Sequence, residues 1–155
     1  MLSFKPNGKD LKVFATGIRQ PWQMAFPKGS NSPFVSDLGQ DSGATNPPDF
    51  LLRVRRGQNY GFPQCNWTKP KLCKGFAKPF KFFAPHADVM GVGIIGNRVY
   101  LSEFLSKLVV STPISGGPTK TLLSGFQAPI VGLGVHGGYV YVGETGLGLV
   151  YRVKA

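Results

Sequence analysis

Acidic residues are scarce in this chain of 155 residues. Seven Asp and Glu stand against 18 Lys and Arg, so the formal net charge is +11 and the pI is about 10.0. Long apolar runs are also missing, since no stretch approaches the roughly 20 residues that cross a membrane. Residues 1–8 lack the apolar core of a signal peptide. We therefore expect no membrane span, and a leader, if the protein is secreted, is absent from this chain.

Further absences exclude other classes of protein. The hydrophobic share of 42% is too high for a disordered chain. The 21 glycines follow no three-residue period, which excludes a collagen-like chain. Long stretches without a helix breaker are rare, because glycine and proline together recur roughly every five residues, whereas a typical helix needs about 11 positions. The sequence predicts an all-β protein of short strands and many turns.

The chain repeats itself at a fixed distance. Residues 91–103 match residues 132–144, 41 positions later, without a gap, and three glycines, a Val, a Tyr and a Glu are identical. A fainter copy lies near the start, where residues 34–37 correspond to residues 100–103. Each copy has the pattern of an apolar strand, a Gly-rich turn and a second apolar strand with an acidic end. A period of about 40 residues with four short strands is typical of a β-propeller blade.

The repeat predicts three blades of four antiparallel strands. We place them at residues 17–84, 88–126 and 128–154, with a long insertion in the first. The third has only three strands of its own, and residues 11–15 form a strand without a blade. A β-sandwich with similar hairpins is the alternative fold. Closed propellers usually have four to eight blades, so three blades indicate either a fragment or copies that assemble into a ring.

Two glycine motifs have the spacing of a dinucleotide-binding loop. They lie at residues 91–96 and 132–137. A dinucleotide-binding loop must be followed by a helix whose N-terminus meets the pyrophosphate. A strand pattern follows each motif here, so we expect no nucleotide site.

The two cysteines, Cys65 and Cys73, are eight positions apart. With only two histidines in the chain, they do not make a convincing zinc site. Free thiols remain the alternative to a disulfide that closes the loop between them. A disulfide would indicate an oxidising compartment.

Basic residues are densest between positions 53 and 81, where aromatic residues alternate with them. Such a surface can bind nucleic acid. In a propeller, a solvated outer face with the aromatics turned into the blades explains it better, so we expect no nucleic-acid partner. An acidic polysaccharide or an anionic cell envelope is an equally good partner for this charge. The basic residues are Arg53, Arg55, Arg56, Lys69, Lys71, Lys74, Lys78 and Lys81.

The first half of the chain contains a familiar order of motifs. Residues 17–26 begin Gly-Ile-Arg-Gln-Pro, residues 34–40 follow, and residues 59–63 read Asn-Tyr-Gly-Phe-Pro. This order resembles the glucose/sorbosone dehydrogenase family, soluble sugar dehydrogenases that use pyrroloquinoline quinone on a six-bladed propeller. The resemblance covers most of the chain but only half of a family propeller. It implies three blades per chain, half of a six-bladed ring.

The resemblance also implies roles for individual residues. Arg19 matches the arginine that contacts the quinone, and Gln20 stands where the family has an asparagine. Gly39 and Gln40 match the turn whose backbone carbonyls hold a calcium ion. His86 is the one candidate for the catalytic base, and histidine is a common base in proteins. An arginine beside a quinone can stabilise the charge that develops on its oxygen.

Each of these roles has a plainer alternative. His86 can be an ordinary turn histidine. Arg19 can form an ion pair with an acidic strand end, for which Asp37, Glu103 and Glu144 are the candidates.

Two hypotheses of function follow. In the first, the chain is an extracellular or periplasmic half-propeller that resembles a quinone-dependent aldose dehydrogenase and is active, if at all, only as an assembled ring. Two copies would close the ring as a homodimer, with residues 11–15 paired against residues 149–153 of the partner, and a sugar would be the substrate. In the second, it is a non-catalytic propeller scaffold for an anionic or carbohydrate partner.

Overall fold

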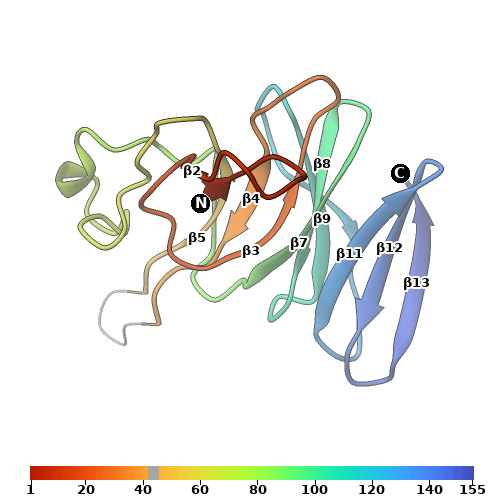
Figure 1. Ribbon diagram of the computed structural model, residues 1–155. Helices are drawn as coiled ribbons and strands as arrows, with labels where there is room; N and C mark the ends of the chain where they lie inside the picture. The colour runs from red at the N-terminus through yellow and green to blue at the C-terminus, as the bar shows by residue number, and fades with distance from the viewer. Residues whose placement is uncertain (42–45) are drawn as a thin grey trace.

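The computed structural model describes residues 1–41 and 46–155. Within these residues every element is a strand except one short 3-10 turn, and the strands form antiparallel sheets that stand side by side (Figure 1). The predicted all-β class and the four-stranded antiparallel blades are confirmed. No helix of the described residues is long and apolar enough to cross a membrane.

Three of the sheets are the blades. In blade one the innermost strand is the first in sequence, and the order across the sheet follows the chain. Blade two has the same order with four strands, and blade three has three. The strands are β3 (Pro21–Ala25), β4 (Phe34–Asp37), β5 (Asp49–Arg53) and β6 (Lys81–Phe83); β7 (Val89–Ile95), β8 (Arg98–Glu103), β9 (Leu108–Pro113) and β10 (Lys120–Leu123); and β11 (Ile130–His136), β12 (Tyr139–Glu144) and β13 (Leu149–Lys154).

The repeat in the sequence is reproduced in the strand register. The β7–β8 and β11–β12 hairpins each turn at a glycine with a positive φ, 57° at Gly96 and 54° at Gly137, which a tight hairpin requires. Both glycine motifs therefore lead into a strand, as expected, and not into a helix. The pairs Val92↔Leu101, Gly93↔Tyr100 and Ile94↔Val99 correspond to Leu133↔Val142, Gly134↔Tyr141 and Val135↔Val140, each 41 positions later.

Neighbouring blades pack through a recurring arrangement. Gly91 and Gly93 on β7 have no side chain, and a Cβ at either position would overlap Leu133 or Val135 of β11. A serine on the second strand adds a hydrogen bond to the next blade. The hydroxyl of Ser36 donates to the Met90 carbonyl at 2.7 Å, and that of Ser102 donates to the Val131 carbonyl at 3.2 Å.

Residues 1–15 form a small hairpin. Strand β1 (Leu2–Ser3) pairs with β2 (Lys12–Val13), with Leu2 opposite Val13 and Ser3 opposite Lys12. Phe14 and Ala15 are buried against blade one. Within this chain, the edge of β2 that was expected to take a partner's residues 149–153 is occupied by β1.

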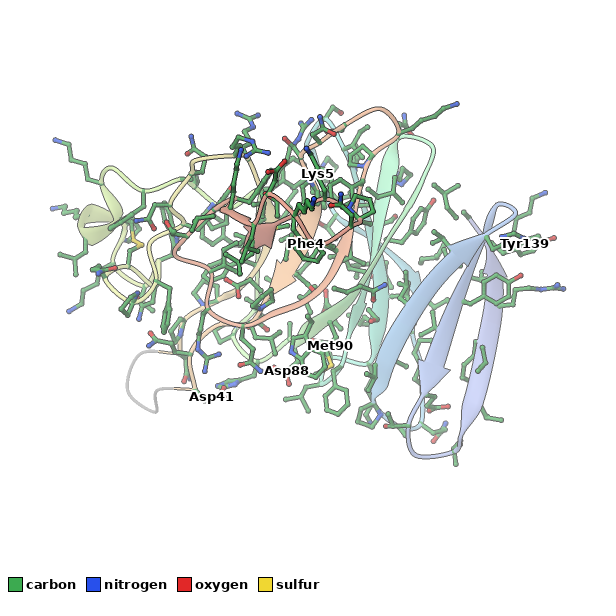
Figure 2. All side chains as sticks on the ribbon, viewed as in Figure 1. Phe4, Lys5, Asp41, Asp88, Met90 and Tyr139 are labelled. Atoms are coloured by element: carbon green, nitrogen blue, oxygen red, sulfur yellow. A yellow bond between two sulfur atoms is a disulfide. The ribbon has the colours of Figure 1, made fainter. Side chains whose placement is uncertain are left out.

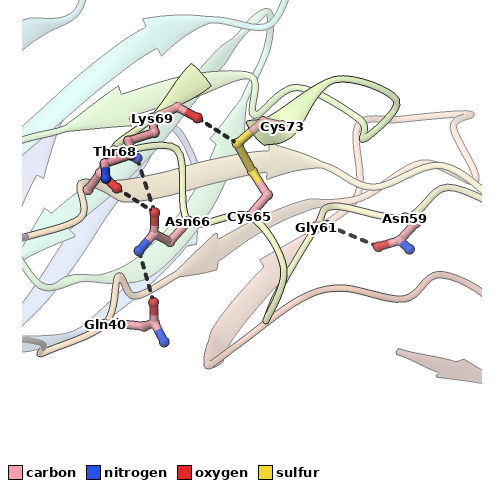
Figure 3. The surroundings of a disulfide bond; sticks show 8 residues. All are labelled: Gln40, Asn59, Gly61, Cys65, Asn66, Thr68, Lys69 and Cys73. Atoms are coloured by element: carbon pink, nitrogen blue, oxygen red, sulfur yellow. Dashed lines mark hydrogen bonds between the residues drawn. A yellow bond between two sulfur atoms is a disulfide. The ribbon is translucent and has the colours of Figure 1, made fainter. Parts of the chain in front are cut away.

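The insertion of blade one is closed by a disulfide. Cys65 and Cys73 are bonded and both are buried, so the predicted disulfide is confirmed (Figure 3). Cys73 ends the 3-10 turn Pro70–Cys73, which begins at a proline. This loop packs beside the turn that follows β4.

Candidate functional site

Three chain segments meet at one end of blades one and two. They are the residues before β3, the turn after β4, and the loop that leads into β7. Figure 2 shows Asp41 and Asp88, from two of these segments, at the same lower edge of the molecule. Four of the sequence-predicted residues, Arg19, Gln20, Gly39 and Gln40, lie in the first two segments. His86 lies in the third.

Arg19 is bound to backbone oxygens. Its Nη1 donates to the carbonyl of Gly39 at 2.5 Å and to that of Leu38 at 3.3 Å, and also to Oε1 of Gln20 at 2.9 Å. No ion pair joins the Arg19 guanidinium to an acidic side chain among the residues described. Arg19 therefore forms no ion pair with Asp37, Glu103 or Glu144 in this structure. The guanidinium instead binds the turn expected to hold calcium.

Asp37 holds the segment that carries Arg19. Its carboxylate is buried and accepts hydrogen bonds from the backbone N–H of Gln20 at 2.6 Å and of Arg19 at 3.3 Å. Burial raises the pKa of Asp37 to about 6, although these N–H donors and the nearby Arg19 charge act in the opposite direction. Glu144 has the equivalent place in blade three, where it accepts from the N–H of Ala128 at 2.5 Å. In blades one and three, the acidic end of the second strand therefore binds the segment that leads into the first strand of the same blade.

Asp49 joins the two loops of the site. Its Oδ1 accepts from the N–H of Gly39 and its Oδ2 from the N–H of Asp88, both at 2.6 Å. Burial raises the pKa of Asp49, and these two N–H donors lower it in part. Because one carboxylate binds both loops, the turn after β4 and the loop before β7 are held at a fixed separation.

His86 lies on the rim of this arrangement. Its Nδ1 is 3.2 Å from Oδ1 of Asp41, and both side chains are exposed. His86 and Asp88 have φ values of 57° and 52°, in the left-handed region that residues other than glycine rarely adopt. The backbone here is strained, and the Asp49 bond to the N–H of Asp88 helps to hold it.

The disulfide loop covers one side of the site. Nδ2 of Asn66 donates to Oε1 of Gln40 at 3.1 Å, as Figure 3 shows. A cavity of about 20 Å³, large enough for about one water molecule, lies between Arg19, Gly39, Tyr60 and Trp67. The space beside Arg19 is therefore small in the chain by itself.

Sequence reasoning missed the carboxylates that organise the site. Asp41, Asp49 and Asp88 belong to no motif, and Asp49 is 39 positions from Asp88. Only their place near turns could have suggested a capping role. The sequence did point to four residues of the site, because they lie within the order of motifs that resembles the dehydrogenase family. They are Arg19, Gln20, Gly39 and Gln40.

The chemistry of these residues bears on the quinone and the calcium ion that the resemblance implies. Arg19 and Gln20 offer cationic and amide donors, which fit an anionic quinone. For calcium, the carbonyl of Gly39 is a hard oxygen ligand, yet it already accepts from the Arg19 guanidinium. The part of the chain that the structure describes has no group of three or more His, Cys, Asp or Glu that could hold a metal. The turn fits calcium only when the guanidinium leaves it.

Comparison with known proteins shows where this fold recurs. No family model and no curated sequence matches the chain. Among solved structures, the pyrroloquinoline-quinone-bound aldose sugar dehydrogenase of Streptomyces coelicolor matches with a TM-score of 0.77 at 18% identity, over 97% of this chain and 49% of that one.

Two further solved structures agree with this match. A glucose dehydrogenase matches with a TM-score of 0.79 at 18% identity, over 97% of this chain and 48% of that one. The apo-form aldose sugar dehydrogenase of Escherichia coli matches with a TM-score of 0.69 at 20% identity, over 84% and 43%. The chain therefore has the β-propeller fold of these dehydrogenases and spans about half of their length.

Proposed function

We propose that the chain is half of a quinone-dependent aldose dehydrogenase ring. The observation that carries the proposal is the position of Arg19. Its guanidinium, the Gln20 amide and the turn at Gly39 and Gln40 come together at one end of the blades. This is the set of residues that the resemblance assigns to the quinone and its metal, and the fold of quinone-bound aldose dehydrogenases supports it.

The roles of the residues follow from their chemistry. A bound quinone would accept hydride from C1 of the sugar. Arg19 would stabilise negative charge on the quinone oxygen. His86 would remove the hydroxyl proton, with the proton going to Nε2, because Nδ1 faces Asp41. Asp37 and Asp49 would act as positioning residues, since their carboxylates bind backbone N–H groups of the site.

Calcium at Gly39 and Gln40 is part of the proposal, with one condition. The Arg19 guanidinium must turn from the Gly39 carbonyl toward the quinone. We therefore expect calcium and quinone to bind together. In the quinone-free chain, Arg19→Ala should raise calcium affinity, measured by calorimetry, and in the same variant quinone binding should weaken. Equal loss of both would contradict this exchange.

The ring requires three further blades, and we propose that a second copy supplies them. We also propose a location outside the cytoplasm, because the Cys65–Cys73 disulfide belongs to oxidising compartments. The substrate is proposed to be an aldose, on the strength of the fold alone.

The test is binding and turnover with the protein at the highest attainable concentration. Addition of pyrroloquinoline quinone and calcium should give a bound-cofactor absorbance and reduction of a dye with aldoses. His86→Ala should remove turnover and leave quinone binding mostly intact. His136→Ala is the matched control, since His136 ends β11 at the opposite end of the blade. If the wild-type protein binds no quinone with calcium present, the assignments of Arg19 and His86 are wrong.

One observation favours the alternative of a non-catalytic binding module. A groove of about 430 Å³ is lined by Arg53, Arg55 and Lys78, on the basic part of the chain. Retention on a sulfated polysaccharide column, together with no quinone binding, would support a scaffold for an anionic carbohydrate.

A further inference from the structure

The N-terminal hairpin repeats the outer half of blade two. Residues 1–12 align with residues 109–120, 108 positions later, without a gap. The N–H of Gly8 donates to the Lys5 carbonyl at 2.8 Å, and the N–H of Gly116 donates to the Pro113 carbonyl at 3.0 Å, which is the same turn. The pairs Ser3↔Lys12 and Leu2↔Val13 correspond to Ser111↔Lys120 and Val110↔Thr121.

The likeness extends to the packing. Phe14 and Ala15 are buried against blade one, and Leu122 and Leu123 pack in the cluster between blades two and three. Leu2 of β1 and its neighbours Met1 and Phe4 share a groove with Met24 of β3 and with Phe26, which follows β3. Strand β1 thus lies on the inner side of β2, as β9 lies on the inner side of β10. The hairpin therefore has the arrangement of the third and fourth strands of a blade.

Blade three has the complementary open face. In blade two, Tyr100 and Val109 are 5% and 0% exposed because blade three covers them. Their counterparts 41 positions later are Tyr141, which is half-buried, and Val150, which is 73% exposed. A Cβ added to Gly132 or Gly134 would have no atom within 4 Å, whereas Gly91 and Gly93 are covered.

Blade one has the side chains that would cover this face. Met24 pairs with Val35 as Leu133 pairs with Val142, so Met24 and Phe26 occupy on blade one the places of Leu133 and Val135. Met24 and Phe26 are 48% and 53% exposed. They would lie over Gly132 and Gly134 of another copy as Leu133 and Val135 lie over Gly91 and Gly93.

We propose that β1 occupies the place of β13 from a second copy. On self-association, blade three of one copy docks in front of blade one of the other, and its β13 replaces β1 along β2. The occupant is a second copy because this chain carries both of the surfaces that would meet. The open glycines of blade three and the exposed Met24 and Phe26 of blade one match the contact between blades two and three. Two chains, each spanning about half of a dehydrogenase propeller, would place one such seam at each junction of a twofold ring. The inference rests on the ring assembly proposed above and not on its chemistry.

Charge opposes this association. If a partner's β13 pairs with β2 in the register of β9 and β10, Arg152 lies opposite Lys12. The corresponding pair in blade two is Ser111 opposite Lys120. Like charges directly opposite each other destabilise a pair of strands, and each chain carries a net charge of +11. We therefore expect dimerisation to strengthen as salt is added, because salt screens exposed charges.

Sedimentation of the full chain tests whether blade three of one copy docks on blade one of another. Arg152→Ser, which copies blade two, should tighten the dimer roughly two- to fivefold. Val150→Lys should weaken it by about tenfold or more, since burial of a Val is lost. Leu147→Lys is the matched control, because Leu147 is exposed in the turn before β13 and outside the seam, and it should leave the dimer unchanged. A monomer at every concentration and salt level, also for Arg152→Ser, would overturn both the inference and the ring.

Strand replacement has its own readouts. A mixture of Lys12→Cys and Arg152→Cys chains should form a disulfide-linked dimer under non-reducing conditions, where the native cysteines stay paired. Hydrogen exchange should show β1 losing protection on dimerisation while β2 keeps it. A dimer that lacks this cross-link and keeps β1 protected would overturn the replacement and leave the ring standing. A cross-linked dimer that binds no quinone would leave the replacement standing and contradict the proposed chemistry.

Discussion

Asp37 is the buried carboxylate on which the candidate site depends. Its pKa is raised to about 6 by burial, from an ordinary value of 3.8. At a pH between these two values, Asp37 is protonated in the folded protein and has lost that proton in the unfolded chain. This contribution therefore stabilises the fold below about pH 4 and is lost as the pH rises toward 6.

Asp37→Asn should reduce this pH dependence. The amide keeps an oxygen that can accept from the N–H of Gln20, and it carries no charge to bury. We expect the free energy of unfolding of the wild-type protein to fall more steeply between pH 4 and 6 than that of the variant. Urea unfolding at several pH values measures both slopes. Parallel slopes would show that Asp37 does not titrate in this range.

At the scale of the element, glycine positions separate covered faces from open ones. Gly93 and Gly134 hold the same place in blades two and three, yet Val135 Cγ1 would lie only 2.5 Å from a Cβ on Gly93, and nothing lies near Gly134. Gly93→Val should lower the free energy of unfolding by about 1–3 kcal/mol through overpacking. Gly134→Val should leave the monomer nearly as stable and weaken self-association. Equal destabilisation of the monomer by both would mean that blade three is covered on this face.

The disulfide loop is a second element with a measurable contribution. It joins residues eight apart in sequence, with both sulfurs buried. Closing a loop of this length stabilises the fold by about 2–3 kcal/mol in the chain-entropy model. The double variant Cys65→Ala/Cys73→Ala should lose this amount in chemical unfolding, and the Asn66 contact to Gln40 should become less ordered. An unchanged unfolding midpoint would show that the loop is rigid without its cross-link.

Much of the blade structure was predictable from the sequence, and the reason is local. The 41-residue match fixes hairpin register, because the positions of Gly96 and Gly137 set the turns. The contacts of Asp49 were not predictable, since they join loops that only the packing of two blades brings together. The N-terminal hairpin was missed because only its glycine turn and the spacing of its paired residues match residues 109–120, and few side chains are identical.

At the scale of the whole molecule, stability does not come from one central core. Separate apolar clusters lie between blade one and blade two, between blade two and blade three, and between blade one and the N-terminal hairpin. Each blade therefore depends on its neighbours, as in repeat proteins whose stability is a sum of unit and interface terms. The exposed face of blade three is the end of this series.

The ungapped match of blades two and three has a consequence for engineering. A blade that presents Leu133 and Val135 to the glycines before it also presents Gly132 and Gly134 to whatever follows. A duplicate of residues 88–128 inserted after residue 128 would therefore meet, on both sides, surfaces that the chain already uses. The arc would grow by one unit without a new interface, so its curvature, and not its chemistry, would decide how many units a closed ring can hold.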